Sequence, residues 1–253
     1  MTIFKKIEFH PFFFIISFIV ILTGQFKEFF LFTSLIFIHE CGHAGMAILW
    51  KWHFEKIIIF PFGGVTKFRE SLNRPIIQEC LILIAGPLSQ IIYYVFLCSI
   101  TDLPPSFSCY HYALLFFNLL PIYPLDGSKL FSLLLEQWFP FKRSYEWMLT
   151  LSLHLSIFLF FYYCFHFQLF FIFFFLFLMI KTLEEKKQVP IIYERFLLER
   201  FLYDFHFPKL KRIKGEKIDS FYRDCKHLFY LNNLCFSEKD ILQKKFDLNR
   251  KVW

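Results

Sequence analysis

The first 180 residues of this chain have fewer charged residues than an ordinary soluble domain of that length. Charged residues make up 19% of the 253 positions, whereas hydrophobic residues make up 57% and phenylalanine alone occupies 41 positions. A typical soluble domain is about 25% charged. The apolar residues gather in long runs up to about residue 180, and the chain is polar after that. The composition therefore excludes a wholly soluble protein and indicates a membrane protein with a polar C-terminal part.

The sequence also lacks paired cysteines and a cleavable leader. The seven cysteines show no C-x-x-C spacing, and free thiols are the expected state in apolar runs and in a cytoplasmic tail. The first apolar run has no small-residue cleavage pattern, so we expect it to be retained in the protein.

Six apolar runs approach the length of a transmembrane helix, since a bilayer core of about 30 Å needs roughly 20 apolar helical residues. They cover residues 9–23, 29–50, 76–100, 111–139, 147–164 and 165–180. The fourth run is interrupted, and the last two form either a tight hairpin or one kinked element. We therefore expect an α-helical polytopic membrane protein with about six transmembrane helices.

The basic residues between these runs predict the orientation of the chain. With the N-terminus in the cytoplasm, only Lys27 falls on an outside loop, as the positive-inside rule requires. The cytoplasmic segments hold Lys5, Lys6, Lys51, Lys56, Lys67, Arg69, Arg74, Lys142 and Arg143. From Lys181 onward, 17 Lys and Arg outnumber 11 Asp and Glu. We expect this basic C-terminal tail to be cytoplasmic and drawn to anionic lipid headgroups, without direct binding to nucleic acid.

The second apolar run contains the motif His-Glu-Cys-Gly-His. Residues four apart lie on one face of a helix, so His39 and His43 can reach one metal ion, and Glu40 can hold a metal-bound water. The alternative is a hydrogen-bonded histidine pair beside an unrelated glutamate. A charged group near the middle of a bilayer costs about 3 kcal/mol, which favours a metal site.

A catalytic zinc ion usually has three protein ligands, so a third ligand is expected elsewhere in the apolar runs. The candidates are Glu79, His111, Asp126, Glu136, Glu146, His154 and His166. Asp126 is favoured because it lies in N-L-L-P-I-Y-P-L-D-G, where Pro121, Pro124 and Gly127 interrupt a helix. Broken backbone at membrane depth lines a polar cavity or is buried in protein. Asp126 also suits the N-cap of the helix that follows, and the two roles are compatible.

Together these two motifs resemble the site-2 protease family of intramembrane zinc metalloproteases. The segments F-P-F-G-G-V (60–65) and A-G-P-L-S-Q (85–90) are similar to two further elements of that family. The chain resembles its sporulation branch, which has six spans and a cytoplasmic C-terminal CBS (cystathionine-β-synthase) module. The resemblance implies zinc ligation by His39, His43 and Asp126, and water activation by Glu40.

The resemblance also implies roles for residues around the metal. Asn118 would contact the substrate or the transition state, and Pro121 would shape the loop beside the cleft. An extended substrate would add as a strand to the Gly63-Gly64 segment. Cys41 departs from the family, where leucine is usual, and a thiolate ligand at this position is the less favoured alternative.

The sequence predicts three parts: a membrane-embedded metalloprotease domain (1–183), a linker helix (184–208) and a small α+β CBS-like domain (209–253). In the last part we expect a strand, a helix over 217–226, a strand, an Asn-Asn turn with a short strand, and a final helix. Ser237 and Asp240 match a ribose-binding pattern of CBS modules, which implies ATP binding completed by a second chain. The alternative is a capping box that opens the last helix.

The function that these features predict is cleavage of a membrane-associated protein precursor. By resemblance, the substrate is a pro-sigma factor of sporulation, and the location is the mother-cell membrane around the forespore. Inhibitory membrane partner proteins and a homo-oligomer are also implied. Two alternatives remain open: a membrane metal transporter, which would spread its ligands along several helices, and an inactive scaffold of the same fold.

Overall fold

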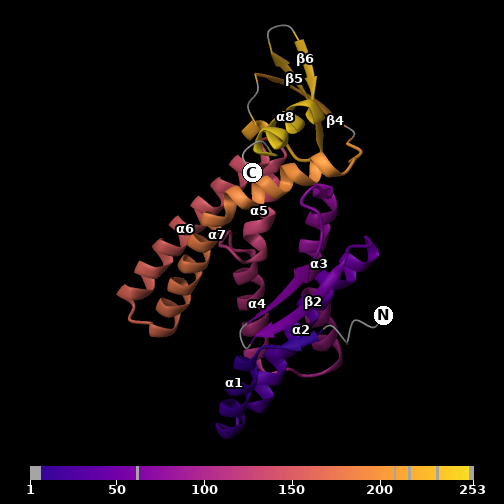
Figure 1. Ribbon diagram of the computed structural model, residues 1–253. Helices are drawn as coiled ribbons and strands as arrows, with labels where there is room; N and C mark the ends of the chain where they lie inside the picture. Colours follow the sequence, from indigo (N-terminus) through magenta and orange to yellow (C-terminus); the bar gives the residue numbers. More distant parts are fainter. Residues whose placement is uncertain (1–6, 61–62, 208, 216–217, 232–233, 251–253) are drawn as a thin grey trace. The chain divides into compact units, whose positions relative to one another are not determined.

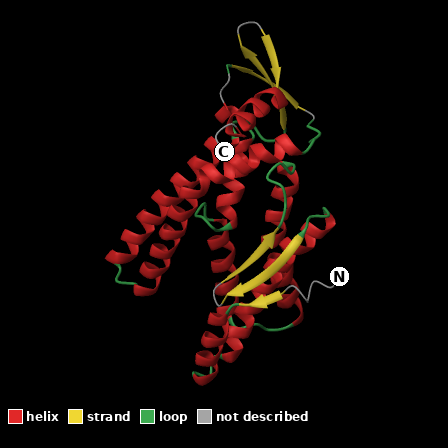
Figure 2. Ribbon diagram, in the orientation of Figure 1, coloured by secondary structure: helices red, strands yellow, loops and turns green. Residues whose placement is uncertain are grey.

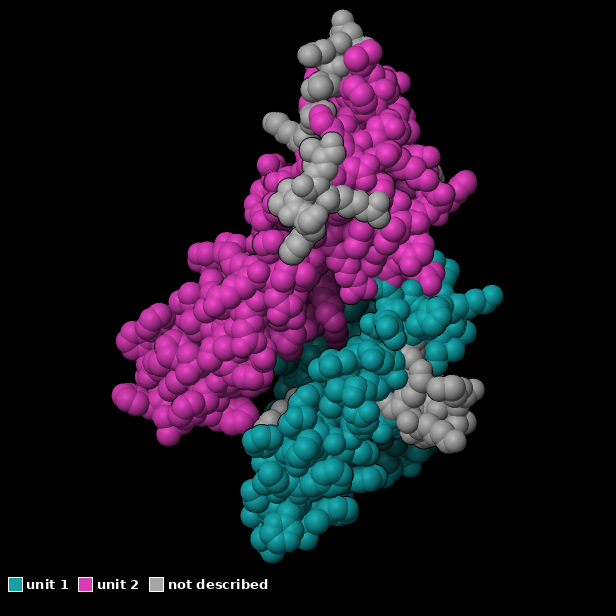
Figure 3. Space-filling view, viewed as in Figure 1, with its two compact units in different colours: residues 1–70, 77–119 teal, residues 71–76, 120–253 magenta. Residues whose placement is uncertain are grey.

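The computed structural model describes residues 7–60, 63–207, 209–215, 218–231 and 234–250. The chain divides into two compact units, shown in different colours in Figure 3. Unit 1 comprises residues 1–70 and 77–119, and unit 2 comprises residues 71–76 and 120–253. Each unit contains helices and one small three-stranded sheet (Figure 2).

Unit 1 consists of long apolar helices and a sheet that lies against one of them. Its elements in chain order are β1 (Ile7–Phe9), α1 (Pro11–Leu22), α2 (Phe26–Leu49), β2 (Phe54–Phe60), β3 (Gly63–Phe68), α3 (Ile76–Ile100) and α4 (Pro105–Leu119). In the sheet, β2 pairs in parallel with β1 and antiparallel with β3. Ile57 and Ile59 of β2 pack with Ala44 of α2, so the sheet covers the second half of that helix.

Small residues on α2 let its neighbours approach. Ala44 and Ala47 are fully buried, and a Cβ at Gly42 would lie 2.9 Å from Ser89 Cβ of α3. Close packing through small residues is typical of helices in membranes, because the hydrophobic effect does not drive helices together in lipid. The middle of α2 is therefore enclosed by α3 on one side and by the sheet on another.

Unit 2 contains a short helix, a helical hairpin and a small α+β domain at its C-terminal end. Its elements are α5 (Asp126–Glu136), α6 (Phe141–Phe165), α7 (Leu169–Leu202), β4 (Lys209–Lys214), the 3₁₀ turn η2 (Ile218–Ser220), β5 (Cys225–Leu231), β6 (Leu234–Ser237) and α8 (Glu238–Arg250). Helices α6 and α7 pack along each other and are joined by three residues (Figure 1). Of the two alternatives for the last two apolar runs, a tight hairpin or one kinked element, the structure shows the hairpin.

The C-terminal domain is built onto the end of α7. Its sheet has the order β4-β5-β6, with β4 and β5 parallel and β6 antiparallel to β5. Phe196 and Leu197 of α7 share a buried cluster with Phe229 of β5 and Leu242 of α8. Because α7 is one helix from Leu169 to Leu202, the predicted linker helix is the continuation of the last apolar helix.

Several sequence predictions can be compared with these elements. Among the described residues, three helices are long and apolar enough to cross a membrane, Phe26–Leu49, Ile76–Ile100 and Phe141–Phe165, so a helical membrane protein is confirmed and the number of six spans stays a prediction. The helix predicted over 217–226 is wrong, because among the described residues 218–226 only Ile218–Ser220 is helical and Cys225 already belongs to β5. The Asn-Asn turn at 232–233 lies outside the described residues. The CBS-like character of the domain stays a prediction.

Arg200 of α7 connects the helix to the C-terminal sheet. Its buried guanidinium donates to Asn73 Oδ1 (2.6 Å), to the carbonyls of Tyr222 (2.7 Å) and Cys225 (2.9 Å), and to Glu238 Oε1 (2.8 Å). Burial lowers the pKa of Arg200, and the Glu238 carboxylate opposes that shift. Both partners of the ion pair are largely buried, so each depends on the other to offset its lost hydration.

We therefore expect Arg200→Met to destabilise the C-terminal domain by about 3–5 kcal/mol, because the Glu238 carboxylate stays buried without its arginine. The matched control is Lys239→Met in the same domain. The ion pair of Lys239 with Asp204 is exposed, so its loss should cost less than about 1 kcal/mol. Pulse proteolysis of the full-length protein in detergent measures both values, and equal values for the two variants would contradict this account.

Candidate metal centre

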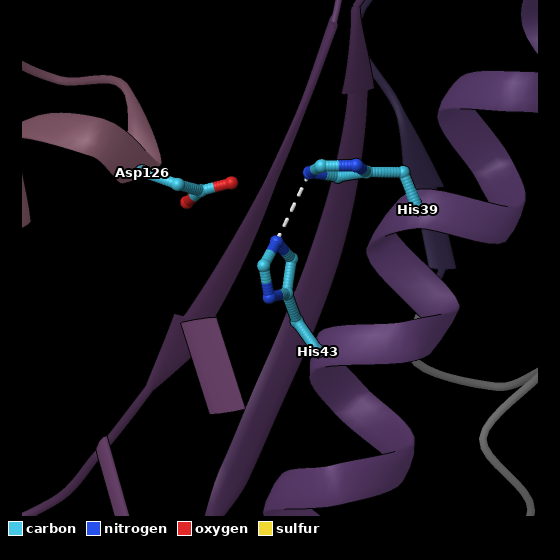
Figure 4. Close-up of side chains that lie close together, drawn as sticks. All are labelled: His39, His43 and Asp126. Carbon is cyan, nitrogen blue, oxygen red and sulfur yellow. Dashed lines mark hydrogen bonds between the residues drawn. The ribbon is translucent and has the colours of Figure 1, made fainter. Parts of the chain in front are cut away.

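The two histidines and the glutamate of the predicted motif lie in the middle of α2. His39, Glu40 and His43 are 2%, 6% and 4% exposed, so all three polar side chains are buried. A helix repeats every 3.6 residues, so His39 and His43 stack on one face. Their rings meet edge to face with centroids 4.8 Å apart (Figure 4).

Helix α3 supplies an oxygen to the outer nitrogen of each ring. His39 Nδ1 lies 3.2 Å from Gln90 Oε1, and His43 Nδ1 lies 2.8 Å from the carbonyl oxygen of Ile82. An oxygen acceptor requires an N–H on the nitrogen that faces it. Both rings are therefore held with Nδ1 as the donor, which leaves Nε2 of each as the nitrogen that can bind a metal.

The two Nε2 atoms lie 3.1 Å apart (Figure 4). With both Nδ1 atoms protonated, two nitrogen lone pairs meet in a water-poor interior, which is unfavourable unless a proton or a metal cation lies between them. Two imidazoles bound to tetrahedral zinc at about 2.0–2.1 Å have nitrogens about 3.3 Å apart. The histidine pair therefore fits a zinc ion.

Two glycines in unit 1 leave room for the His43 ring and for the Glu40 carboxylate. A Cβ at Gly86 of α3 would lie 2.9 Å from His43 Cδ2 and closer still to Nε2. The A-G-P element noted in the sequence thus places a glycine where the His43 imidazole must fit. On the other side of α2, a Cβ at Gly64 of β3 would lie 2.7 Å from Glu40 Oε1.

The Glu40 carboxylate is held by strand β3. Thr66 Oγ1 donates a hydrogen bond of 2.6 Å to Glu40 Oε2, while Oε1 packs against Gly64. Successive side chains alternate across a strand, so positions 64 and 66 share one face, and exposed Val65 points the other way. One carboxylate oxygen is thus fixed by a hydroxyl group, and the other lies beside backbone that has no side chain.

Asp126 belongs to unit 2, where it is the first residue of α5. The helix of the fourth apolar run ends at Leu119 and resumes at Asp126, as the two prolines predict. The peptide bond between Tyr123 and Pro124 is cis. The prediction that Asp126 is the N-cap is wrong by one position, because the N-cap is Leu125, whose extended backbone precedes the first helical turn. A carboxylate in that first turn is still favoured by the helix dipole.

Tyr123 anchors this loop to α6 and α7. Its backbone N–H donates to Ser152 Oγ (2.7 Å), and its hydroxyl donates to Glu185 Oε2 (2.9 Å). Tyr145 of α6 donates to the other oxygen of Glu185 at 2.6 Å. The segment that presents Asp126 is therefore fixed within unit 2.

The remaining predicted site residues lie as follows. Asn118 is half-buried at the end of α4, and Pro121 is in the loop before α5. Gly63 and Gly64 open β3, opposite Phe60 and Ile59 of β2.

At the other end of the chain, Ser237 and Asp240 form the capping box of α8. Asp240 Oδ2 accepts from Ser237 Oγ (2.7 Å) and from its N–H (2.8 Å), and the Asp240 N–H donates to Ser237 Oγ (3.3 Å). The capping alternative is confirmed, whereas ribose binding stays a prediction.

Comparison with known proteins agrees with the centre. The family described as "Peptidase family M50" matches residues 28–105, which include the histidine pair. The chain is 33% identical to Stage IV sporulation protein FB of Bacillus subtilis over 78% of its own length and 71% of that protein. This chain belongs to peptidase family M50, the site-2 protease family. Its members are zinc metalloproteases that work within the membrane, and the resemblance predicted from the motifs is confirmed.

Two further relatives come from Methanocaldococcus jannaschii. The zinc metalloprotease MJ0392 is 30% identical over 45% of this chain and 35% of that protein. The match to a solved site-2 protease from this organism covers 71% of this chain and 90% of that chain, with a TM-score of 0.56 and 24% identity. The structural match supports the fold of the M50 protease.

We expect Gly86→Ala to weaken zinc binding by roughly tenfold or more, because the added methyl group displaces the His43 ring and overpacking costs about 1–3 kcal/mol. Gly45→Ala is the matched control on α2, since nothing lies within 4 Å of a Cβ there. Chelator competition on the purified proteins compares them. Equal affinities for Gly86→Ala and the wild type would mean that the ring does not need this space.

We expect Thr66→Val to lower kcat about tenfold or more, with KM and zinc content unchanged, because a hydrogen bond to a charged group contributes about 1.5–3 kcal/mol. Thr66→Ser keeps the hydroxyl and should keep most of the activity. Peptide cleavage by the zinc-loaded enzyme measures both variants. A Thr66→Ser variant as slow as Thr66→Val would show that the methyl group, not the hydroxyl, is needed.

Proposed function

We propose that this M50 protease holds one zinc ion between His39, His43 and Asp126, and that it cleaves a membrane-associated precursor protein. The observation that carries the proposal is the pair of Nε2 atoms 3.1 Å apart with both outer nitrogens bonded to oxygen. Asp126 is proposed as the third ligand because it opens α5 directly after the proline-broken segment, which Tyr123 anchors to Ser152 and Glu185. Two nitrogens and a carboxylate are a usual donor set for catalytic zinc.

The residues of unit 1 supply the acid–base chemistry. When bound, a zinc ion polarises the scissile carbonyl and lowers the pKa of water toward about 7. Glu40 accepts the proton of the attacking water through Oε1, while Thr66 holds Oε2. The same carboxyl group then gives the proton to the leaving amine. Burial of Glu40 keeps bulk water from competing for that proton.

The substrate is proposed to bind as an extended strand. A helical peptide bond hides its carbonyl in the helix ladder, so the cleaved segment must unwind. In the part of the chain that the structure describes, β3 pairs with β2 on one edge only. A peptide added to the other edge would run past Gly63 and Gly64, next to the Glu40 carboxylate. Asn118 is proposed to bind the developing oxyanion, and Pro121 to shape the loop.

The finer functional assignments rest on likeness to Stage IV sporulation protein FB. They are a pro-sigma factor as substrate, inhibitory membrane partners, six spans, and the mother-cell membrane around the forespore as location. Nucleotide binding by the C-terminal domain and its completion by a second chain are proposed on the same ground. Hydrolysis is favoured over metal transport because Glu40 is positioned beside the histidine pair by a dedicated hydroxyl group.

Metal content tests the proposed site. Full-length wild-type protein in detergent should contain about one zinc ion per chain, and Asp126→Asn should lose it, because a neutral amide is a poor zinc ligand. Glu40→Gln should keep the zinc and lose cleavage of a co-expressed precursor, because an amide cannot accept the proton. Retention of zinc by Asp126→Asn would remove this residue from the site, and cleavage by Glu40→Gln would remove Glu40 from the mechanism.

A further inference from the structure

We propose that Gln90, supported by His111, is the positioning residue that sets the orientation and tautomer of His39 and thereby the zinc affinity of the site. The inference rests on the proposed function, since it concerns the same metal. It assigns a positioning role to two residues for which the sequence motifs gave no such role.

The Gln90 amide is bonded at both ends. Its Oε1 lies 3.2 Å from His39 Nδ1, and its Nε2 donates to the carbonyl oxygen of His111 at 3.0 Å and lies 3.2 Å from His111 Nδ1. A carbonyl oxygen can only accept, so the NH₂ end of the amide must face His111 and the oxygen must face His39. The orientation of the amide is therefore fixed by backbone, and it directs a hydrogen-bond acceptor at His39.

This acceptor decides which nitrogen of His39 can bind the metal. A neutral imidazole carries its proton on one nitrogen, and the proton resides where an acceptor receives it. With the proton on Nδ1, the Nε2 lone pair points toward His43 Nε2. If Gln90 were apolar, His39 could take the other tautomer or turn its ring, and the two nitrogens would no longer converge.

His111 is held firmly enough to orient the amide. Its ring stacks on Tyr94 with centroids 4.0 Å apart and planes 9° apart, and the Tyr94 hydroxyl bonds to Ser108 Oγ at 2.9 Å. His111 is 2% exposed and lies on α4, whereas Gln90 lies on α3 and His39 on α2. Three helices thus contribute to one buried polar chain. The sequence offered His111 as a third ligand, but its Nδ1 faces Gln90.

Burying the Gln90 side chain costs free energy, which indicates that its amide has a role. Its side chain is 0% exposed inside a unit made of apolar helices, where an unbonded amide would cost about 1–3 kcal/mol. A leucine could fill the same space. His43 Nδ1 is hydrogen-bonded to a backbone carbonyl, that of Ile82. His39 Nδ1 is hydrogen-bonded to a side chain, that of Gln90, so this second bond can be removed by substitution. Such outer partners of metal-bound histidines usually change metal affinity by 10–100-fold when replaced.

The test compares zinc affinity in full-length protein by chelator competition. Gln90→Leu should bind zinc 10–100-fold more weakly than the wild type. Gln90→Glu should bind it nearly as well, because its carboxylic acid form keeps an oxygen facing His39 and an O–H for the His111 carbonyl. Gln78→Leu is the matched control, since Gln78 is a glutamine of the same helix that accepts from Trp52 instead. It should leave zinc affinity unchanged.

A cobalt-substituted sample separates positioning from loss of fold. The visible spectrum of bound Co²⁺ should change in Gln90→Leu and stay as in the wild type for Gln78→Leu. His111→Phe keeps the ring stack and the backbone carbonyl, so its zinc affinity should fall by less than that of Gln90→Leu.

Three results would overturn the inference. One is wild-type zinc affinity in Gln90→Leu. Another is weak binding in Gln90→Glu equal to that in Gln90→Leu. The third is a larger loss of zinc affinity in His111→Phe than in Gln90→Leu, which would make His111, not Gln90, the residue that controls the site. These results differ from failure of the proposed function, in which the wild type itself would hold no zinc.

Discussion

The interaction on which the centre depends is the approach of two imidazole nitrogens to 3.1 Å inside an apolar helical unit. Each ring donates its outer N–H to an oxygen of α3, and therefore each directs a lone pair at the other. In water the two rings would separate or exchange protons with solvent. In the interior of unit 1 they are held together by packing, so a cation is the natural way to relieve their repulsion. The buried histidine rings and their oxygen partners on α3 thus form a place where positive charge is stabilised.

The same requirement explains why the neighbours of α2 have the residues they do. Gly86 leaves room for the His43 ring, Gly42 lets α3 come close, and β3 brings Thr66 to Glu40. None of these residues contributes chemistry of its own. Each fixes a distance that the chemistry needs, and positioning by packed secondary structure is more exact than positioning by loops.

Local patterns in the sequence predicted part of this arrangement. The facing of His39 and His43 follows from helical spacing, and the break before Asp126 follows from two prolines, so both could be predicted. Thr66 and Gln90 could not, because their contacts with α2 join positions 26 and 51 residues apart. Alternation on β3 was the one available signal for Thr66. The helix expected over 217–226 is absent because tertiary context, with Arg200 bonded to the carbonyls of Tyr222 and Cys225, overrides local propensity.

Strand β3 has two tasks that belong together in a protease. Through Thr66 it holds one oxygen of the Glu40 carboxylate, and through its open edge it is proposed to receive the substrate. Because a strand is stiff along its length, β3 would hold the Glu40 carboxylate and an added peptide at fixed positions relative to each other. The proton acceptor would then keep its distance from the scissile bond whichever side chains the substrate carries. Recognition through backbone in this way would suit the proposed substrate, whose cleaved segment has to be extended.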